Sequence, residues 1–355
     1  MSDAIAALVL EDGTVFEGRP YGAAGRAPGL AVFYTGVVGY QEVLTDPSYR
    51  GTILVLTFPI AGAYGVNAQD NQSPALHPAG VVVREASRTH SNWRSNGSLE
   101  DLLKARGIVG VREVDTRAVA VHLRDKGEMR GAVVSGEFDA AAVARDLKAP
   151  PPARDLVGEA TWEEVRPARG PETCRLVVLN LGATESLLGQ LAALGARVEV
   201  LRADASAKDV LKGKPRGVVV AGGPGDPGAL EGPIETVRAL LGRVPLLGIG
   251  LGHQVLALAL GCRIERMKAG HRGVNYPVRD RPSGTSRITA QGHGFVVSAE
   301  GLAPSAEVTH TNLNDGTVEG VRAREAPAWG LQFHPQPDDF GRPSDLLRAF
   351  IAGQK

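Results

Sequence analysis

Cysteine is scarce in this sequence, and its scarcity narrows the class of protein. Only Cys174 and Cys262 occur among the 355 residues, too few for the disulfide framework of a small secreted domain. Such cysteine usage is typical of a reducing compartment, so we expect a cytoplasmic protein.

Neither an excess of charge nor a long apolar run is present. The 39 basic and 39 acidic residues cancel, so bulk charge predicts no nucleic-acid partner and no membrane partner. No apolar stretch reaches the ~18 residues that span a bilayer. The apolar run Ala4–Leu10 has no basic residue before it and meets Glu11-Asp12-Gly13, which predicts a strand and a turn rather than a signal peptide.

Residues 1–148 are expected to form an α+β domain, because strand-like runs and helices occur there without strict alternation. The expected strands are Ala6–Leu10, Thr14–Phe16, Leu30–Tyr34, Ile53–Thr57 and Ala79–Val83. The expected helices are Ser98–Lys104, which Ser98 would cap, and Asp115–Leu123. Residues 149–172 are rich in proline and are predicted to be a linker, because proline disfavours helix and sheet pairing alike.

Residues 173–355 are expected to form a doubly wound, mostly parallel α/β domain, so the overall class is α/β. Short apolar strands alternate with helices, a pattern typical of parallel strands covered on both faces. The elements that carry this pattern are the strands Leu176–Leu179, Val198–Leu201, Gly217–Val220 and Val244–Ile249 and the helices Glu185–Leu194, Ile234–Leu241 and Leu251–Leu260. Ligands on such sheets bind beyond the carboxyl ends of the strands.

A side chain is missing where this pattern calls for one. The strand Val244–Ile249, a glycine-rich turn and the helix Leu251–Leu260 have the architecture of a nucleophile elbow, which presents one reactive side chain above the sheet edge. The residue at the elbow is Gly250. The fold is therefore easier to predict than the chemistry.

Other motifs at strand ends leave alternatives open. Gly222–Pro227 predicts either an amide nest for an anion or carbonyl oxygen or an ordinary tight turn; no Gly-Lys-Ser/Thr follows, so it is not a P-loop. Gly248–His253 departs from the dinucleotide-binding pattern at its third glycine. His334 is either a general base or a hydrogen-bonded edge residue. The histidines lack paired metal-ligand spacing, so no metal site is expected.

Nearly the whole chain resembles the small, glutaminase subunit of carbamoyl phosphate synthetase (also called synthase). The N-terminal matches are Leu10–Gly18, Gly39–Tyr49, Ser91–Arg94, Asp115–Arg117 and Leu123–Gly127, and they separate this family from other glutamine amidotransferases. The C-terminal matches to class I amidotransferases are Gly223–Pro227, Gly248–Gln254, Thr309–Gly316 and Gln332–Pro335.

The resemblance implies a function. In this family a cysteine on the elbow attacks the side-chain carbonyl of glutamine, a histidine moves protons and a carboxylate orients that histidine. The ammonia released is joined to bicarbonate by a large subunit, for arginine and pyrimidine biosynthesis. The implied partner is that large subunit in a heterodimer, and the implied ligand is glutamine. ATP and magnesium are expected only in the large subunit, so this chain is expected to hold no cofactor.

The family's site residues transfer to this sequence position by position. The catalytic positions are Gly250, His334 and Gln336. The glutamine-binding positions are Ser48, Gly223, Gly225, Leu251, Gln254, Gly292, Gly294 and Phe295. Three of these depart from the family pattern: Gly250 replaces the cysteine, Gln336 the carboxylate and Gly292 an asparagine.

The departures predict that this chain does not hydrolyse glutamine. No Ser, Thr or Cys occurs from Val244 to Gly261, and Cys262 would lie about 18 Å along the helix from the elbow. Losing the nucleophile of a triad costs about 10⁶-fold in turnover. Because three changes fall on one reaction centre, we favour natural loss over a single sequencing or engineered change. The alternative function is a non-catalytic, glutamine-sensing or regulatory pseudo-amidotransferase.

Overall fold

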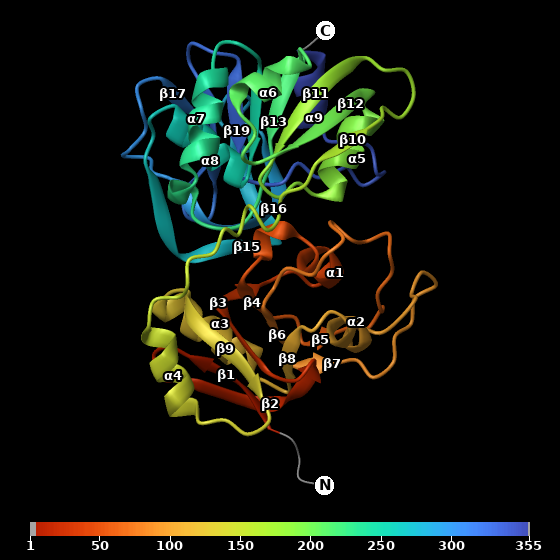
Figure 1. Cartoon of the computed structure of the whole chain (residues 1–355), viewed down its shortest axis with the longest axis vertical. Helices are drawn as coiled ribbons and strands as arrows, with labels where there is room; N and C mark the ends of the chain where they lie inside the picture. The colour runs from red at the N-terminus through yellow and green to blue at the C-terminus, as the bar shows by residue number, and fades with distance from the viewer. Residues whose placement is uncertain (1–4, 354–355) are drawn as a thin grey trace. The chain divides into compact units, whose positions relative to one another are not determined.

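The computed structural model describes residues 5–353, and the chain forms two compact units (Figure 1). The first unit comprises the residues up to Arg154 together with Lys268–Arg272. The second comprises Asp155–Met267 and the residues from Gly273 onward. Five residues late in the sequence therefore belong to the N-terminal unit, which the sequence pattern did not predict.

The first unit is built on a closed barrel in the order β1-β2-β8-β6-β4-β3-β9. The neighbours β3 and β4, β4 and β6, and β6 and β8 are parallel, and the remaining pairs are antiparallel. A two-stranded parallel sheet, β5 and β7, stands apart from the barrel. The strands are β1 Ala6–Leu10, β2 Val15–Gly22, β3 Arg26–Tyr34, β4 Thr52–Leu56, β5 Ile60–Ala61, β6 Gly80–Val82, β7 Glu85–Ala86, β8 Val109–Arg112 and β9 Met129–Ser135.

Helices cover this barrel because its strands are apolar on both faces. One core contains Leu8, Ile53 and Val133 together with Leu123 of α3. A second core joins the strands to α1 and α2, and a third joins β1 and β9 to α4. The helices are α1 Tyr40–Leu44, the 3-10 helix Pro47–Tyr49, α2 Leu99–Ala105, α3 Thr116–Lys126 and α4 Ala140–Lys148. Ser98 accepts a hydrogen bond from the N–H of Asp101, so the predicted cap is confirmed.

The segment 149–172 contains more structure than a linker. Glu164–Arg166 forms the strand β10, which pairs antiparallel with β12 at the edge of the second unit's sheet. Val157 and Ala160 are buried. The expectation that proline prevents sheet pairing here is wrong, because the residues between Pro152 and Pro167 contain no proline and an edge strand needs only one paired side.

The second unit contains a ten-stranded sheet in the order β10-β12-β11-β13-β14-β19-β18-β16-β15-β17. Its centre, from β12 to β19, is parallel, as the alternation of strands and helices predicted. The strands are β11 Cys174–Asn180, β12 Ala196–Arg202, β13 Gly217–Val220, β14 Leu246–Ile249, β15 Ile264–Asp280, β16 Ser286–Val297, β17 Ala306–Asn312, β18 Val318–Ala323 and β19 Ala328–Leu331.

Both faces of the parallel centre are buried under helices (Figure 1). Alternate residues of one strand point to opposite faces: Val177 packs with α6, α7 and α8, whereas Val178 packs with α5 and α9. The helices are α5 Glu185–Ala193, α6 Ala207–Lys212, the 3-10 helix Pro227–Ala229, α7 Glu231–Leu240, α8 Leu251–Ala259 and α9 Asp345–Ala352. Burial on both faces explains why these strands are continuous apolar runs.

The antiparallel strands β15 to β18 were not predicted as a sheet extension. Their sequences mix charged and apolar residues, and both β15 and β16 have exposed positions along their length. We find no helix among residues 5–353 that is long and apolar enough to cross a membrane.

Candidate functional site

The predicted elbow is present in the second unit. The strand β14 ends at Ile249 and α8 begins at Leu251, so Gly250 alone makes the turn. Its backbone angles are φ 57° and ψ −117°. Residues other than glycine adopt this combination only at an energetic cost. The N–H of Gly250 donates to the carbonyl of Leu331 at 2.8 Å, which fixes the turn against the end of β19.

The elbow has room for a side chain. A Cβ atom built on Gly250 would lie 3.5 Å from Cα of Gly222 and 4.0 Å from the carbonyl oxygen of Gln332, which are ordinary van der Waals distances. By contrast, a Cβ on Gly252 would lie 2.0 Å from the carbonyl oxygen of Val220. Gly252 is therefore required by packing, whereas Gly250 is not.

His334 lies beside the elbow, as its place after β19 predicted. Its N–H donates to the carbonyl of Ala290 at 3.0 Å. Its ring carbon Cε1 lies 3.9 Å from where a Cβ on Gly222 would stand. Gly222 is thus a close neighbour of both His334 and Gly250, so the structure places the histidine near the elbow.

Gln336 does not support His334. Its side chain is exposed, and within residues 5–353 we find no hydrogen bond from it to the histidine. The backbone that follows His334 is instead held by Gln190 of α5. Nε2 of Gln190 donates to the carbonyl of Pro335 at 3.0 Å. The Oε1 of Gln190 accepts the N–H of Ser344 at 2.8 Å. Gln190 was missed by sequence reasoning, because a glutamine within a helix carries no motif.

Two backbone N–H groups lie in segments next to Gly250. Leu251 is the first residue of α8, where the N–H has no acceptor within the helix, and Gly223 follows Gly222. Within the described residues we find no hydrogen bond of either N–H. A Cβ on Gly223 would lie 2.0 Å from the carbonyl oxygen of Leu181, so this position requires glycine, and Gly225 has φ 98°. Such amides can bind a carbonyl oxygen or an anion.

The remaining predicted glutamine-binding positions of this unit lie on α8 and β16. Nε2 of Gln254 donates to the carbonyl of Phe295 at 2.7 Å and to Oε1 of Gln332 at 3.0 Å, so the amide group of Gln254 is bound within the protein. Gly292 and Gly294 lie beside Phe295 on the same strand. Gln332 is buried. Its hydrogen bond with Gln254 could not be predicted from the motifs.

Ser48 belongs to the first unit. It lies in the 3-10 helix Pro47–Tyr49, where its N–H donates to Oδ1 of Asp46 at 2.8 Å. Asp46 thus caps the short helix and fixes the backbone at Ser48.

Cys262 lies in a hydrophobic core and not at the elbow. It is buried and packs with Ala257, Val297 and Val321. Burial raises the pKa of its thiol, so the reactive thiolate is disfavoured. The elbow region therefore has two backbone amides and a histidine nearby, and position 250 has no side chain. That no metal is needed here stays a prediction.

His253 lies on α8, close to the elbow. It is fully buried, and burial together with nearby His310 lowers its pKa to about 3. His253 is therefore neutral in the folded protein at neutral pH. It serves the packing of α8 against β19, since a Cβ on Gly330 would lie 2.6 Å from its Nδ1.

Comparison with known proteins identifies a family for each part of the chain. Residues 8–133 match the family "Carbamoyl-phosphate synthase small chain, CPSase domain", and residues 177–348 match "Glutamine amidotransferase class-I". The chain is 41% identical to the carbamoyl phosphate synthase small chain of Rhodopirellula baltica, over 93% of this chain and 91% of that one. It is 42% identical to that of Bacillus caldolyticus, over 97% and 96%. The pyrimidine-specific small chain of Halalkalibacterium halodurans is 41% identical, over 96% and 94%.

We expect Gly250→Cys and Gly250→Ala to lower the melting temperature by similar amounts. Both side chains fit the space but must adopt the positive φ of the elbow, at a cost of about 1–3 kcal/mol. Thermal unfolding measures the change. Gly232→Ala is the matched control, because Gly232 lies in α7 with nothing within 4 Å of its Cβ position, and it should be neutral or stabilising. A rise in melting temperature for either elbow variant would contradict a strained turn.

The second prediction concerns acid stability. The pKa of His253 is depressed from 6.5 to about 3 on folding, so its contribution is present above pH 6.5 and is lost as pH falls towards 3. Between pH 7.5 and pH 5 the loss is roughly 2 kcal/mol. Denaturant unfolding at both pH values measures it. His253→Gln should flatten this dependence, and an unchanged dependence in that variant would assign the acid sensitivity to other groups, such as buried His77, whose pKa burial lowers to about 4.

Proposed function

The chain belongs to the carbamoyl phosphate synthase small-chain family, and we propose that it acts in that synthase as a small chain without glutaminase activity of its own. Family membership rests on the match over residues 8–133 and on relatives that cover more than nine tenths of the chain. The synthase is a glutamine-hydrolysing ligase, and a small chain implies a large-chain partner. The loss of glutamine hydrolysis is the step that we add.

One observation carries this proposal: the elbow has the backbone geometry and the space for a nucleophile, and its residue is Gly250. Glutamine hydrolysis in this family begins when a thiolate forms a bond to the amide carbon and expels ammonia. Without a side chain at position 250, no nucleophilic atom is present to form that bond. His334 would then have no thiol to deprotonate, and exposed Gln336 supplies no negative charge to stabilise an imidazolium.

What this chain would contribute is binding rather than chemistry. We place the synthesis of carbamoyl phosphate in the large chain, with free ammonia as the nitrogen donor and with ATP and magnesium bound there. We assign the product to arginine or pyrimidine biosynthesis and the complex to the cytoplasm. The pyrimidine-specific name of one relative favours the pyrimidine route.

We expect the purified complex of this chain with its large chain to use ammonium but not glutamine. Carbamoyl phosphate formation should be robust with an ammonium salt, and with glutamine it should not exceed the blank that contains no nitrogen donor. A donor-comparison assay under matched ATP and bicarbonate measures both rates.

His334→Asn provides the internal control for this assay. If the chain performs no glutamine chemistry, the substitution leaves both rates unchanged. Glutamine-driven synthesis that clearly exceeds the blank and falls in His334→Asn would show a working glutaminase and overturn the proposal.

A second function has specific support. The N–H groups of Gly223 and Leu251 have no hydrogen-bond partner among residues 5–353. They lie near Gly250, which has no side chain and no charge. Glutamine, or another small amide, could place its carbonyl oxygen there without being cleaved. The chain would then report the presence of the amide to its partner instead of consuming it.

We expect isothermal titration calorimetry with glutamine to detect binding in the millimolar range or tighter if this second function is correct. Leu251→Pro removes the N–H at the first helical position, where proline is tolerated, and should abolish the heat. The absence of heat in the unaltered chain at millimolar glutamine would remove the sensing function and leave the first proposal intact.

A further inference from the structure

A buried histidine of the first unit, His77, contacts polar groups on both sides of its ring. Its exposed fraction is 7%. Nδ1 of His77 lies 3.0 Å from Nη1 of Arg50, and Nε2 lies 2.7 Å from Oγ of Ser73. Both ring nitrogens therefore have polar partners within this unit, which fixes the orientation of the ring. None of these three residues belongs to a motif that the sequence revealed.

The position of the proton on His77 follows from its partners. A guanidinium only donates hydrogen bonds, so Nδ1 accepts from Arg50 and the ring proton is on Nε2. Nε2 then donates to Oγ of Ser73, and the Ser73 hydroxyl donates to the carbonyl of Thr45 at 2.8 Å. Burial, together with the charge of Arg50, lowers the pKa of His77 to about 4, so the ring is neutral at neutral pH.

This chain of hydrogen bonds reaches the first and the last residue of the segment 45–50, which contains Ser48. Backbone bonds support the same arrangement. The N–H of His77 donates to the carbonyl of Leu44 at 2.9 Å, and the N–H of Gly51 donates to the carbonyl of His77 at 3.2 Å. A 3-10 helix of three residues has too few hydrogen bonds to hold its own shape. The place of Ser48 therefore depends on these flanking contacts.

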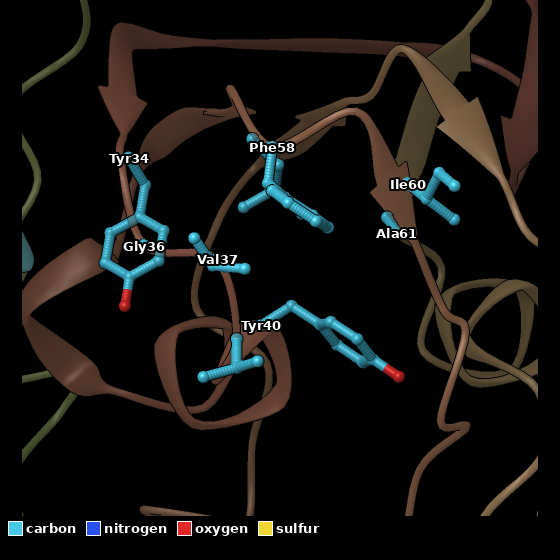
Figure 2. A pocket seen from close by; sticks show the side chains of 9 residues that line it. Tyr34, Gly36, Val37, Tyr40, Phe58, Ile60 and Ala61 are labelled. Atoms are coloured by element: carbon cyan, nitrogen blue, oxygen red, sulfur yellow. The ribbon is translucent and has the colours of Figure 1, made fainter.

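Ser48 is the exposed member of its short helix. Pro47 and Tyr49 are buried on either side of it, whereas Ser48 is partly exposed. The ring of Tyr49 meets that of Tyr34 edge-on, with centroids 6.4 Å apart, and Tyr34 also borders the small hollow shown in Figure 2. Among residues 5–353 we find no hydrogen bond of the Ser48 hydroxyl, so this group is available to a ligand.

We propose that His77 is a positioning residue for Ser48, whose hydroxyl it holds in place to hydrogen-bond a bound glutamine. Ser73 and Arg50 transmit this support to the backbone on either side. The inference rests on the second proposed function, in which the chain binds glutamine without cleaving it. A hydroxyl can donate to the carboxylate of a free amino acid or accept from its ammonium group. A hydroxyl that is fixed before binding loses less conformational entropy when the ligand arrives, so a loosened backbone lowers the affinity although the hydroxyl is still present.

The support can be tested without any ligand, by hydrogen–deuterium exchange of the full chain. In His77→Ala the amides of residues 45–51 should exchange about tenfold faster or more, because buried polar partners lose their hydrogen bonds. Ser73→Ala is the milder variant and should accelerate exchange in the same segment. His122→Ala is the matched control, because His122 is a histidine of the first unit on α3 that pairs with Asp12, and it should leave residues 45–51 unchanged. Melting temperatures verify that every variant folds.

Calorimetry with glutamine tests the link to Ser48. His77→Ala should weaken binding about tenfold. His77→Gln should restore most of the affinity, because its amide can donate to Ser73 and accept from Arg50. In a Ser48→Ala background, His77→Ala should change the affinity by less than about twofold, because the hydroxyl that it positions is absent. A histidine that merely stabilised the fold would weaken binding equally in both backgrounds.

The outcomes separate this inference from the proposed function. If residues 45–51 exchange at the same rate in His77→Ala and in the unaltered chain, the positioning role is overturned. If they exchange faster but the loss of affinity is the same with and without the Ser48 hydroxyl, the role is also overturned, and glutamine sensing stands. If the unaltered chain binds no glutamine, the sensing function falls, whereas faster exchange in His77→Ala would still support the hold of His77 on Ser48.

Discussion

The close approach of α8 to the ends of the central strands is the constraint on which the candidate site depends. A Cβ on Gly252 would meet the carbonyl oxygen of Val220 at 2.0 Å, one on Gly248 would meet that of Gly252 at 2.5 Å, and one on Gly223 would meet that of Leu181 at 2.0 Å. Contacts this short leave no room for any side chain. These glycines allow the helix N-terminus to sit directly over the carboxyl edge of the sheet, where its amides become a binding element.

Gly250 differs from these neighbours, and the difference separates fold from chemistry. Its Cβ position is free of clashes, so packing does not demand glycine there. The only local gain is relief of a positive φ. A change at position 250 can therefore remove a nucleophile without disturbing the strand, the helix or the amides around it. The loss of a side chain is compatible with an otherwise complete scaffold.

The sequence predicted the parts of the fold that follow from local pattern. A continuous apolar strand such as β13, Gly217–Val220, indicates burial on both faces, and Ser98 indicates a helix start. The unit boundary could not be predicted in the same way, because Lys268–Arg272 joins the first unit through long-range contacts. In the site, motif positions such as His334 were found, whereas Gln190 and Gln332 were missed because their roles depend on tertiary neighbours. The strand β10 was missed because the prolines around it dominated the composition.

A scaffold with backbone amides and a histidine around a glycine elbow is consistent with the proposed small chain that contributes association rather than glutamine hydrolysis. The core of the second unit does not involve the side chain at position 250, so stability places no penalty on its absence. The first unit, in turn, exposes the valines Val37 and Val38 on the loop between β3 and α1, and apolar side chains exposed to water favour contact with another surface. A glycine elbow in the other unit does nothing to cover them. Association with a partner would, because it would bury these apolar side chains.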